Sequence, residues 1–367
     1  MILIIALIFI LVLWGVKTNP EPQNNFSKHE CDSFRGAGCI FVFIAHTLGR
    51  VLSENGLTTI DKPYGCEFFS YDFFNILLNS FGALAVGMFF MLSGYGLALQ
   101  FKKNNNGYLK KMYFFKMPKI YLILILTNIL FYLVNFLKSD LLAGEVALRI
   151  FGFEWIDRLN GASWYLNTLL VLYLSFSTIN LICYKVKNKD LVLCLSAAIP
   201  VVVMSVIIFT YNRYGFNVGI HMRGIFCFML GTIYFIFKPK IDSLLLKYGK
   251  YFVLFSILPI IIFQEPLEVM QENISCFLFC VDLIYFSLLF TNKNKVLKWF
   301  SSISLYFYIF NFLFIDVLLP LIKINWFLYF LVMCVTTILV AVIWTYADKY
   351  TTIGIKKLFT RNKLSKK

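Results

Sequence analysis

Long, uninterrupted apolar runs constrain the fold of this chain more than any other feature of its sequence. The hydrocarbon core of a bilayer is about 30 Å thick, and a helix crosses it with roughly 20 consecutive apolar residues. We identify eleven candidate segments, at residues 2–16, 36–52, 76–99, 113–137, 164–182, 190–211, 219–237, 250–264, 272–290, 302–322 and 325–346. Only the segments 2–16 and 250–264 are clearly short. Because the runs do not alternate and exceed the roughly 10 residues of a membrane β-strand, they predict helices.

The composition indicates that lipid, and not water, is the main solvent of this chain. Of its 367 residues, 60% are hydrophobic and 14% are charged, whereas about a quarter of a soluble domain is charged. These values exclude a soluble enzyme, a secreted disulfide scaffold and a disordered tail. The nine cysteines show no paired spacing, so they predict buried apolar side chains and no metal site. The predicted fold is an all-α polytopic transmembrane helix bundle.

The net charge of +15 predicts the orientation of the bundle in the membrane. Connections between successive segments alternate between two sides. One side carries 26 Lys and Arg against 6 Asp and Glu, and the other carries 7 against 11. Because basic connections stay in the cytoplasm, the N-terminus is expected outside and the C-terminus in the cytoplasm. The excess of positive charge therefore requires no nucleic-acid partner.

The first apolar segment does not have the charge pattern of a signal peptide. A signal peptide begins with a basic region, but no charge precedes Ile2, and Lys17 follows the apolar run. Cleavage would leave the segment up to Arg35 outside and would invert every later connection. We therefore expect three regions: an extra N-terminal transmembrane helix with a cytoplasmic linker at 1–34, ten core helices at 35–347, and a basic cytoplasmic tail at 348–367.

His46 is the strongest candidate for chemistry within the membrane, where an ionisable side chain is costly. It follows Arg35 by eleven residues, which is about three helical turns and about 16 Å, so the two side chains share one helix face. Imidazole can transfer a proton near neutral pH. A histidine satisfied by a neighbouring helix fits the sequence equally well.

The spacing of Arg35 and His46 resembles the signature of the acyltransferase-3 family of integral-membrane acyltransferases. A second match is Val86-Gly-Met-Phe-Phe-Met-Leu-Ser-Gly-Tyr95, in which Gly87 replaces the acidic residue of the family. A third is the basic stretch with Lys110-Lys111 and Lys116-Met-Pro118-Lys-Ile-Tyr121. Weaker matches are Ser163-Trp-Tyr-Leu166, Arg223 to Gly231, and Phe300 to Asn311, where Asn311 replaces a histidine of the family. The resemblance covers about residues 30–346.

The resemblance implies an O-acyltransferase of a bacterial inner (plasma) membrane. It implies ten core helices, acetyl-CoA as the donor substrate without a permanently bound cofactor, and a cell-surface or lipid-linked glycan as the acceptor. Membrane lipid is the surrounding partner, and a homodimer is left open. A transporter or flippase for a similar glycan is the alternative, and a sensor or structural protein without catalysis is a third hypothesis.

We assign candidate roles to twelve residues on these grounds. His46 is the expected general base. The expected ligands of the acyl-CoA phosphates are Arg35, Lys110, Lys111 and Lys116. The expected contacts of the acceptor or acyl group are Ser93, Tyr95, Arg50, Trp164, His221, Arg223 and Asn311. Several alternatives stay open, because a lysine can extend to the membrane surface, a Ser-Gly pair can serve helix packing, and Trp164 fits an aromatic belt. A covalent acyl-histidine and an acyl group carried on Ser93 are also open.

Overall fold

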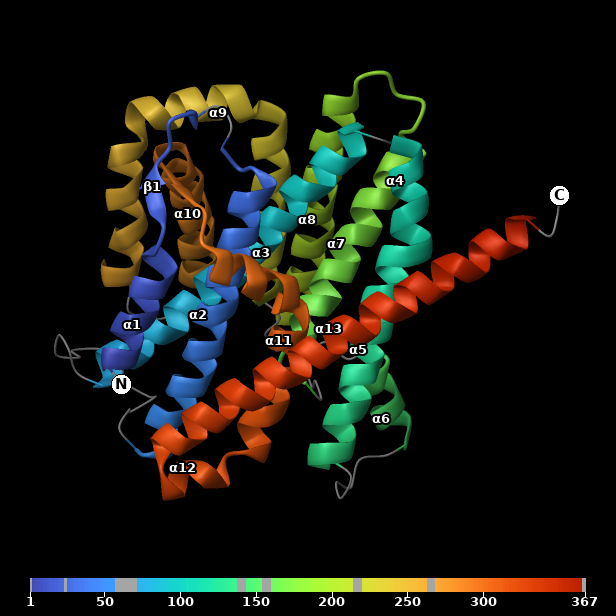
Figure 1. Cartoon of the computed structure of the whole chain (residues 1–367). Helices are drawn as coiled ribbons and strands as arrows, with labels where there is room; N and C mark the ends of the chain where they lie inside the picture. Colours follow the sequence, from blue (N-terminus) through green and yellow to red (C-terminus); the bar gives the residue numbers. More distant parts are fainter. Residues whose placement is uncertain are drawn as a thin grey trace.

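The computed structural model describes residues 2–22, 25–56, 71–103, 105–136, 143–153, 160–213, 220–262 and 268–364. It is a bundle of helices, so the predicted all-α polytopic fold is confirmed (Figure 1). Residues 365–367 of the predicted tail lie outside the described residues. In chain order the elements are α1 (Ile2–Leu13), β1 (Val16–Thr18), α2 (Lys28–Glu54), α3 (Tyr71–Lys103), α4 (Asn105–Lys111), the π-helical turn η2 (Met112–Lys116), α5 (Met117–Phe131), the π-helical turn η3 (Tyr132–Phe136), α6 (Ala143–Ile150), α7 (Ser163–Ile182), α8 (Lys189–Arg213), α9 (Ile220–Ile262), α10 (Glu268–Leu289), β2 (Phe290–Asn292), α11 (Lys295–Val317), α12 (Pro320–Ile324) and α13 (Trp326–Leu364).

Eight helices within the described residues are long and apolar enough to cross a bilayer. They are Lys28–Glu54, Phe81–Lys103, Gly107–Val134, Ser163–Ile182, Lys189–Thr210, His221–Val253, Lys295–Val317 and Trp326–Tyr350. Two shorter apolar helices, Ile4–Leu13 and Asn273–Leu289, coincide with two further segments expected from the sequence. The number of ten core spans stays a prediction.

Helix α9 joins two of the expected segments, 219–237 and 250–264, without an intervening loop. The backbone leaves helical geometry only at Phe237, with φ −105° and ψ 19°, and then resumes the helix. Pro239 falls in the first turn after this kink, where a missing N–H costs nothing. The expectation of a loop over 238–250 is therefore wrong, and this stretch runs as helix across one end of the bundle (Figure 1).

Helix α1 is short and is attached to the bundle through its C-terminal end. Its 12 residues extend about 18 Å, which is less than the thickness of the bilayer core. Strand β1 pairs antiparallel with β2, with Val16 opposite Asn292. The amide groups of Asn292 and Asn294 donate to the carbonyls of Val12 and Leu11, which are among the unpaired carbonyls at the end of α1. A full crossing by residues 2–16 stays a prediction.

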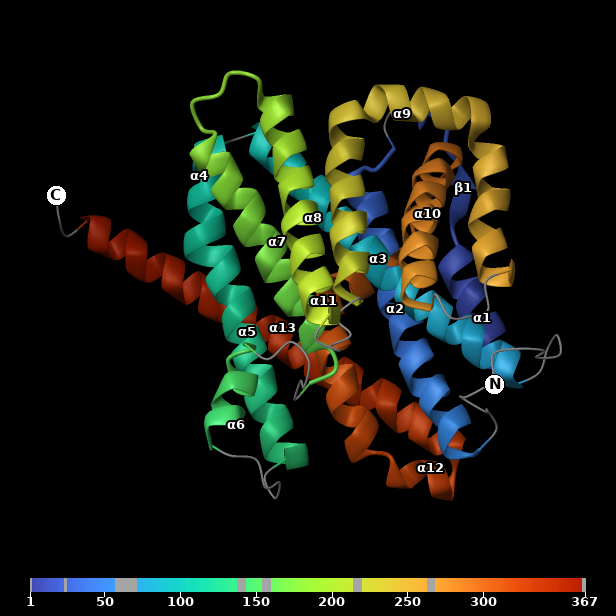
Figure 2. The ribbon, with the colours of Figure 1, turned by 180° about the vertical axis from the view of Figure 1, so that it is seen from behind.

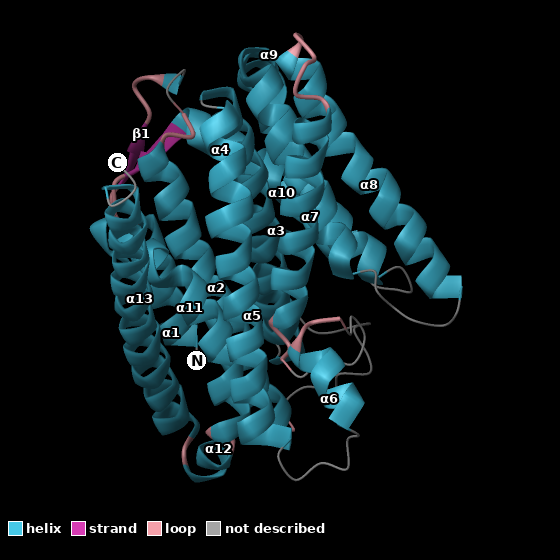
Figure 3. Ribbon diagram, turned by 90° about the vertical axis from the view of Figure 1, so that its right-hand side faces the viewer, coloured by secondary structure: helices cyan, strands magenta, loops and turns pink. Residues whose placement is uncertain are grey.

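Ion pairs join segments that the charge pattern assigns to the same side of the membrane. Lys102 lies 3.0 Å from Asp190, and Lys119 pairs with Asp348, so segments assigned to the basic side meet each other. At the other end Arg50 lies 3.8 Å from Asp316. Figure 3 shows β1 at the opposite end of the bundle from α6 and α12. The side that faces the cytoplasm stays a prediction.

Glycines allow the central helices to approach closely. A Cβ on Gly36 of α2 would collide with the carbonyl group of Leu297 in α11. A Cβ on Gly94 of α3 would collide with the carbonyl oxygen of Phe228 in α9, and one on Gly231 with that of Met91. Small residues at these crossings bring backbones together where lipid supplies no hydrophobic drive. From behind, α9 and α10 form one side of the bundle, beside α2 and α3 (Figure 2).

The crossing of α3 and α9 predicts the effect of one added methyl group. Gly94→Ala should destabilise the protein by about 1–3 kcal/mol, because the new Cβ meets backbone that cannot move aside. The measurement is the thermal unfolding midpoint of the purified protein in detergent. Gly96→Ala, two residues away on the same helix, is the control, because no atom lies within 4 Å of its added Cβ. Equal midpoints for the two variants would contradict the close approach.

Candidate functional site

His46 lies on α2, in the part of the helix that packs against α11. Helix α2 begins at a capping box, in which Ser27 and Glu30 each satisfy the backbone N–H of the other. The ring of His46 packs against the ring of Phe312 on α11, with 4.4 Å between centroids. Within the described part of the chain neither ring nitrogen has a hydrogen-bond partner, and the side chain is half-buried. The ring is therefore held by packing, and not by a hydrogen bond from the described residues.

Helix α11 holds this face of α2 along its whole length. The contacts run from Cys39, whose thiol points at the carbonyl of Ser304, through Phe43 on Phe307 to Arg50 beside Asp316. The order of these contacts shows that the two helices run parallel. His46 is therefore fixed in depth by packing above and below it. Arg50 lies one turn beyond His46 and 3.4 Å from Glu54, so it is already paired at this end of the helix.

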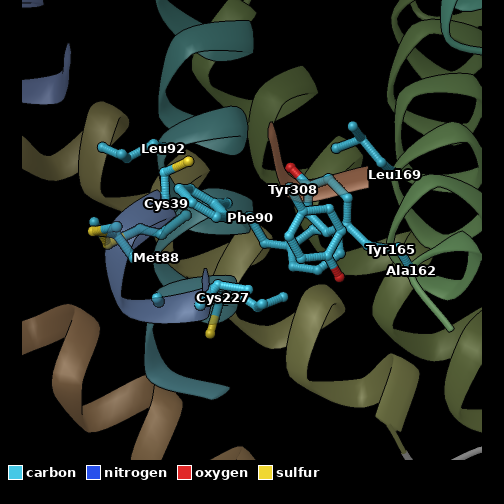
Figure 4. Packing of buried hydrophobic residues seen from close by; sticks show 14 of the residues in the cluster. Cys39, Met88, Phe90, Leu92, Ala162, Tyr165, Leu169, Cys227 and Tyr308 are labelled. Carbon is cyan, nitrogen blue, oxygen red and sulfur yellow. The ribbon is translucent and has the colours of Figure 1, made fainter. Parts of the chain in front are cut away.

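An aromatic row connects His46 with the interior of the bundle. We use this name for Tyr165 of α7, Tyr308 and Phe312 of α11, and His46. Tyr165 and Tyr308 have centroids 5.3 Å apart, and Tyr308 and Phe312 are 5.8 Å apart. Figure 4 shows the rings of Tyr165 and Tyr308 against each other, near Phe90 of α3. The row runs from the interior of the bundle to His46, and we call this course of ring contacts the path.

Arg35 lies at the other end of this path, within a group of cations. It forms an ion pair with Asp32 at 3.3 Å, and its side chain is 38% exposed. Its charge acts on Tyr165 and Tyr173 of α7, so Arg35 lies within electrostatic range of both tyrosines. The charges of Arg35 and Lys111 also act on the ammonium group of Lys116. Three of the four expected phosphate ligands therefore lie within electrostatic range of one another.

The π-helical turn η2 positions the basic stretch. Lys116 ends this turn, with its ammonium 5.5 Å from the ring centroid of Tyr108 and 3.4 Å from the side-chain oxygen of Gln100. Lys110 and Lys111 end α4 and are exposed. π-Helical turns occur often at functional sites. Lys110 is next to Lys111 in the sequence, but its side chain has no described contact with Arg35, Lys111 or Lys116.

The two candidates from the second motif separate in space. Ser93 forms a hydrogen bond with the hydroxyl of Tyr173, and the charge of Arg35 acts on the same hydroxyl. Ser93 therefore lies on the side of α3 that faces α7. Tyr95 is buried in a different cluster, where it stacks on Tyr234 at 5.7 Å and meets the edge of Phe26. Two residues along an α-helix turn the side chain by about 200°, so Tyr95 and Ser93 point to different sides of α3, and the expected contact of Tyr95 with substrate stays a prediction.

A buried polar network adjoins the cluster of Tyr95. The amide of Asn25 donates to the hydroxyl of Tyr234 at 2.8 Å, and that hydroxyl donates to Asp242 at 2.8 Å. Lys238 completes the network with an ion pair to Asp242 at 2.9 Å. These groups satisfy one another and tie the segment before α2 to the kinked part of α9.

Three further candidates meet where α7 packs against α9. His221 is fully buried, and its Nδ1 lies 2.5 Å from the hydroxyl of Thr168. Trp164 is also buried and meets the ring of His221 edge-on at 6.0 Å, which rules out the aromatic-belt alternative for this tryptophan. Arg223 is buried nearby, where its charge acts on the thiol of Cys227. Trp164 meets Tyr165 edge-on at 6.4 Å, so this group adjoins the Tyr165 end of the aromatic row.

Asn311 lies at the depth of His46 on a neighbouring face of α11. It directly precedes Phe312 and lies one helical turn after Phe307. Phe307 packs on Phe43 of α2. Its side chain is 1% exposed, and both its amide atoms lack a hydrogen-bond partner among the described residues. The expected substrate contact at Asn311 stays a prediction.

Sequence reasoning missed the residues that link the candidates. The residues of this group are Tyr165, Tyr173, Tyr308, Phe312 and Asn160. The chain contains 41 phenylalanines and 21 tyrosines, so no aromatic position stands out by type. Asn160 precedes a glycine and a predicted helix start, a signal that indicates a turn but no chemistry. Among the described residues, no group of three His, Cys, Asp or Glu side chains is placed to hold a metal ion.

Comparison with known proteins identifies the chain over most of its length. A family model of the type-3 acyltransferases, described as an acyltransferase domain, matches residues 28–346. No curated protein and no solved structure matches the chain. The match begins at the first residue of α2 and includes both His46 and the whole aromatic row.

The contact between Thr168 and His221 predicts a structural role that can be measured. The single proton of the Thr168 hydroxyl goes to the carbonyl of Trp164 at 2.7 Å, so Nδ1 of His221 donates to Thr168. Thr168→Val should cost about 1–3 kcal/mol of stability, because it leaves this buried N–H without an acceptor. Thr336→Val is the control, since the hydroxyl of Thr336 bonds only to carbonyls of its own helix. Equal unfolding midpoints would refute the contact.

Proposed function

Because the chain belongs to the acyltransferase-3 family, we propose that it transfers an acetyl group from cytoplasmic acetyl-CoA to a hydroxyl group of a cell-surface or lipid-linked glycan. Membership of this family and its eight apolar helices make it a multi-pass membrane acyltransferase. The observation that carries the finer proposal is the unpartnered imidazole of His46, at the end of an aromatic row that leads from Arg35. A bacterial inner membrane is the proposed location.

The cations around Arg35 support an anionic donor. Acyl-CoA carries several phosphate charges, and like-charged side chains held close together gain stability when an anion binds between them. Arg35, Lys111 and Lys116 form such a group at the end of the bundle that the charge pattern assigns to the cytoplasm. The distance of about 16 Å along α2 from Arg35 to His46 is within reach of the extended pantetheine arm.

Direct transfer is the simplest chemistry for this geometry. His46 accepts the proton of the glycan hydroxyl as its oxygen attacks the thioester carbonyl carbon. The tetrahedral intermediate then expels the thiolate of CoA, which takes the proton back from the imidazolium. General-base catalysis of this kind contributes typically about 10²–10⁴-fold. Ser93 is less suited to carry the acyl group, because its hydroxyl already interacts with Tyr173 and does not adjoin His46.

Replacement of His46 tests the proposed base. His46→Gln keeps a polar side chain of similar size but cannot accept a proton, so transfer should fall by about 10²–10⁴-fold. The measurement is the incorporation of radiolabelled acetyl groups from acetyl-CoA into the glycan fraction of membranes that contain the protein. His29→Gln is the control, since His29 lies in the first turn of the same helix, far from the aromatic row. Full transfer by the His46 variant would remove the assigned base.

Replacement of Arg35 tests the donor site. Arg35→Ala should raise the KM for acetyl-CoA about tenfold or more, because one charged hydrogen-bond partner of the phosphates is lost. High salt should raise the KM of the unaltered protein as well, since screening weakens the attraction. Lys187→Ala removes an exposed cation from the connection between α7 and α8 and should leave this KM unchanged. A KM for acetyl-CoA that responds equally to both substitutions would refute a local donor site.

A further inference from the structure

Asn160 presents a fixed and unpartnered hydrogen-bond donor in the interior of the protein. It is fully buried in the turn before α7. Its side-chain oxygen accepts from the N–H of Ala162 at 2.7 Å, and its carbonyl accepts from the N–H and hydroxyl of Ser163 at 3.0 and 2.7 Å. In the described part of the chain Nδ2 has no partner. The turn thus holds the amide group in one orientation and leaves both its N–H bonds unused.

The orientation of this amide follows from its neighbour. An N–H group can only donate, so the atom that faces the Ala162 N–H must be the side-chain oxygen, and the other atom must be the NH₂ group. A buried donor without an acceptor costs about 1–3 kcal/mol, and buried polar groups in native proteins are nearly always paired. Oδ1 of Asn160 already accepts from Ala162, so Nδ2 is the atom left without a partner among the described residues, and a ligand that accepts a hydrogen bond would satisfy it.

The turn that carries Asn160 lies against the aromatic row. A Cβ on Gly161 would come within 3.1 Å of two ring atoms of Phe312, so the backbone of the turn touches the ring on which His46 packs. At the start of α7, Tyr165 packs on Tyr308, and Figure 4 shows Ala162 near this pair of rings. The turn and His46 therefore contact the same aromatic ring from two different elements.

We propose that Nδ2 of Asn160 donates a hydrogen bond to the carbonyl oxygen of the acyl group and stabilises the oxyanion formed during transfer. This inference rests on the proposed acyl transfer at His46. A thioester carbonyl oxygen accepts hydrogen bonds and donates none, so it matches a group that only donates. A hydroxyl group of the acceptor can also accept from Nδ2, but only the acyl oxygen develops a negative charge during transfer, and this charge gains most from a fixed donor.

The proposed donor stabilises the charge that forms on the acyl oxygen during the reaction. As the glycan oxygen bonds to the carbonyl carbon, the electron pair of the C=O bond moves to the oxygen, and His46 takes the hydroxyl proton. Asn160 stabilises the negative charge on this oxygen until the electron pair returns and the bond from carbon to sulfur breaks. A preoriented donor in a site without bulk water stabilises such a charge without reorganisation, and removal of one such donor costs about 10²–10³-fold in kcat.

Asn167 provides a matched control on the same helix. It is also buried, and its Nδ2 also lacks a partner among the described residues. Its side-chain oxygen, however, faces Gly152 at the end of α6, next to Leu124, and not Phe312. The amide of Asn167 is therefore as buried as that of Asn160 but lies beside α6. Its replacement tests whether an effect on transfer requires a position beside the aromatic row.

The experiment compares three variants of the full-length protein in liposomes. Asn160→Ser keeps an oxygen that can accept from the Ala162 N–H but is too short to replace Nδ2, and Asn160→Ala removes both functions. Radiolabelled acetyl-CoA is the donor, and the glycan fraction of the host membrane is the acceptor. We expect Asn160→Ser to lower kcat by about 10²–10³-fold with the KM for acetyl-CoA unchanged, and Asn167→Ser to stay within about threefold of the unaltered protein.

Hydrolysis of acetyl-CoA in the absence of glycan separates the possible outcomes. Water attack passes through the same oxyanion, so Asn160→Ser should lower hydrolysis in parallel with transfer at an unchanged unfolding midpoint. Undiminished transfer, or a higher KM for the glycan with full hydrolysis, would overturn the assignment of Asn160. An unaltered protein that neither transfers nor hydrolyses acetyl-CoA would instead overturn the proposed function, and the inference with it.

Discussion

The parallel packing of α2 on α11 is the constraint on which the candidate site depends. The missing side chain of Gly36 lets the two backbones meet near Leu297, and the helices stay in contact as far as Arg50 and Asp316. His46 and Phe312 fall inside this stretch, so their ring contact is set by the register of two whole helices. A histidine placed this way is held by packing, and its ring nitrogens have no hydrogen-bond partner among the described residues. Helix packing thus fixes the position and orientation of this side chain, a role that hydrogen bonds have in many soluble proteins.

The same arrangement explains why unsatisfied polar groups persist in the interior. A bilayer offers no water to buried donors, and each orphaned group lowers stability. Such groups at the depth of His46 include both amide atoms of Asn311 and the NH₂ group of Asn160. By contrast, the polar groups around Asn25 at the basic end satisfy one another. Unpaired atoms also occur toward the basic end of the described chain, at Nδ1 of His29 and the hydroxyl of Tyr108, so an orphaned polar atom indicates a substrate site only beside a second observation.

Sequence patterns predicted the features that depend on neighbouring residues, such as the positions of the apolar helices. They did not predict the features that depend on contacts between distant helices. Helix periodicity placed Arg35 and His46 on one face, and hydropathy located the apolar helices. The basic stretch 238–250 was expected as a loop from its charges, but it contains no strong helix breaker after Pro239 until Gly249, and the helix of α9 continues. The aromatic row joins α2, α7 and α11, which are remote in the sequence, so no pattern within one segment indicates it. Tyr95 was assigned by motif, and only the packing with Tyr234 shows its structural role.

The network around Asn25 links the position of Arg35 to the far side of the bundle. Asp242 is buried, and Lys238 and Tyr234 both bind it, so loss of Lys238 would leave its carboxylate without a counter-ion and loss of Tyr234 would remove a buried hydrogen bond. Phe26 takes a left-handed backbone conformation, with φ 58°, directly after Asn25 and packs on Phe34 of α2. The strain at Phe26 is tolerated because its ring is held by the tyrosines on α3 and α9. Since Phe34 immediately precedes Arg35, this cluster fixes the position of α2 at Arg35. The kink of α9 and the first turns of α2 therefore act as one unit, which the contacts of Phe26 and Asn25 with Tyr234 hold together.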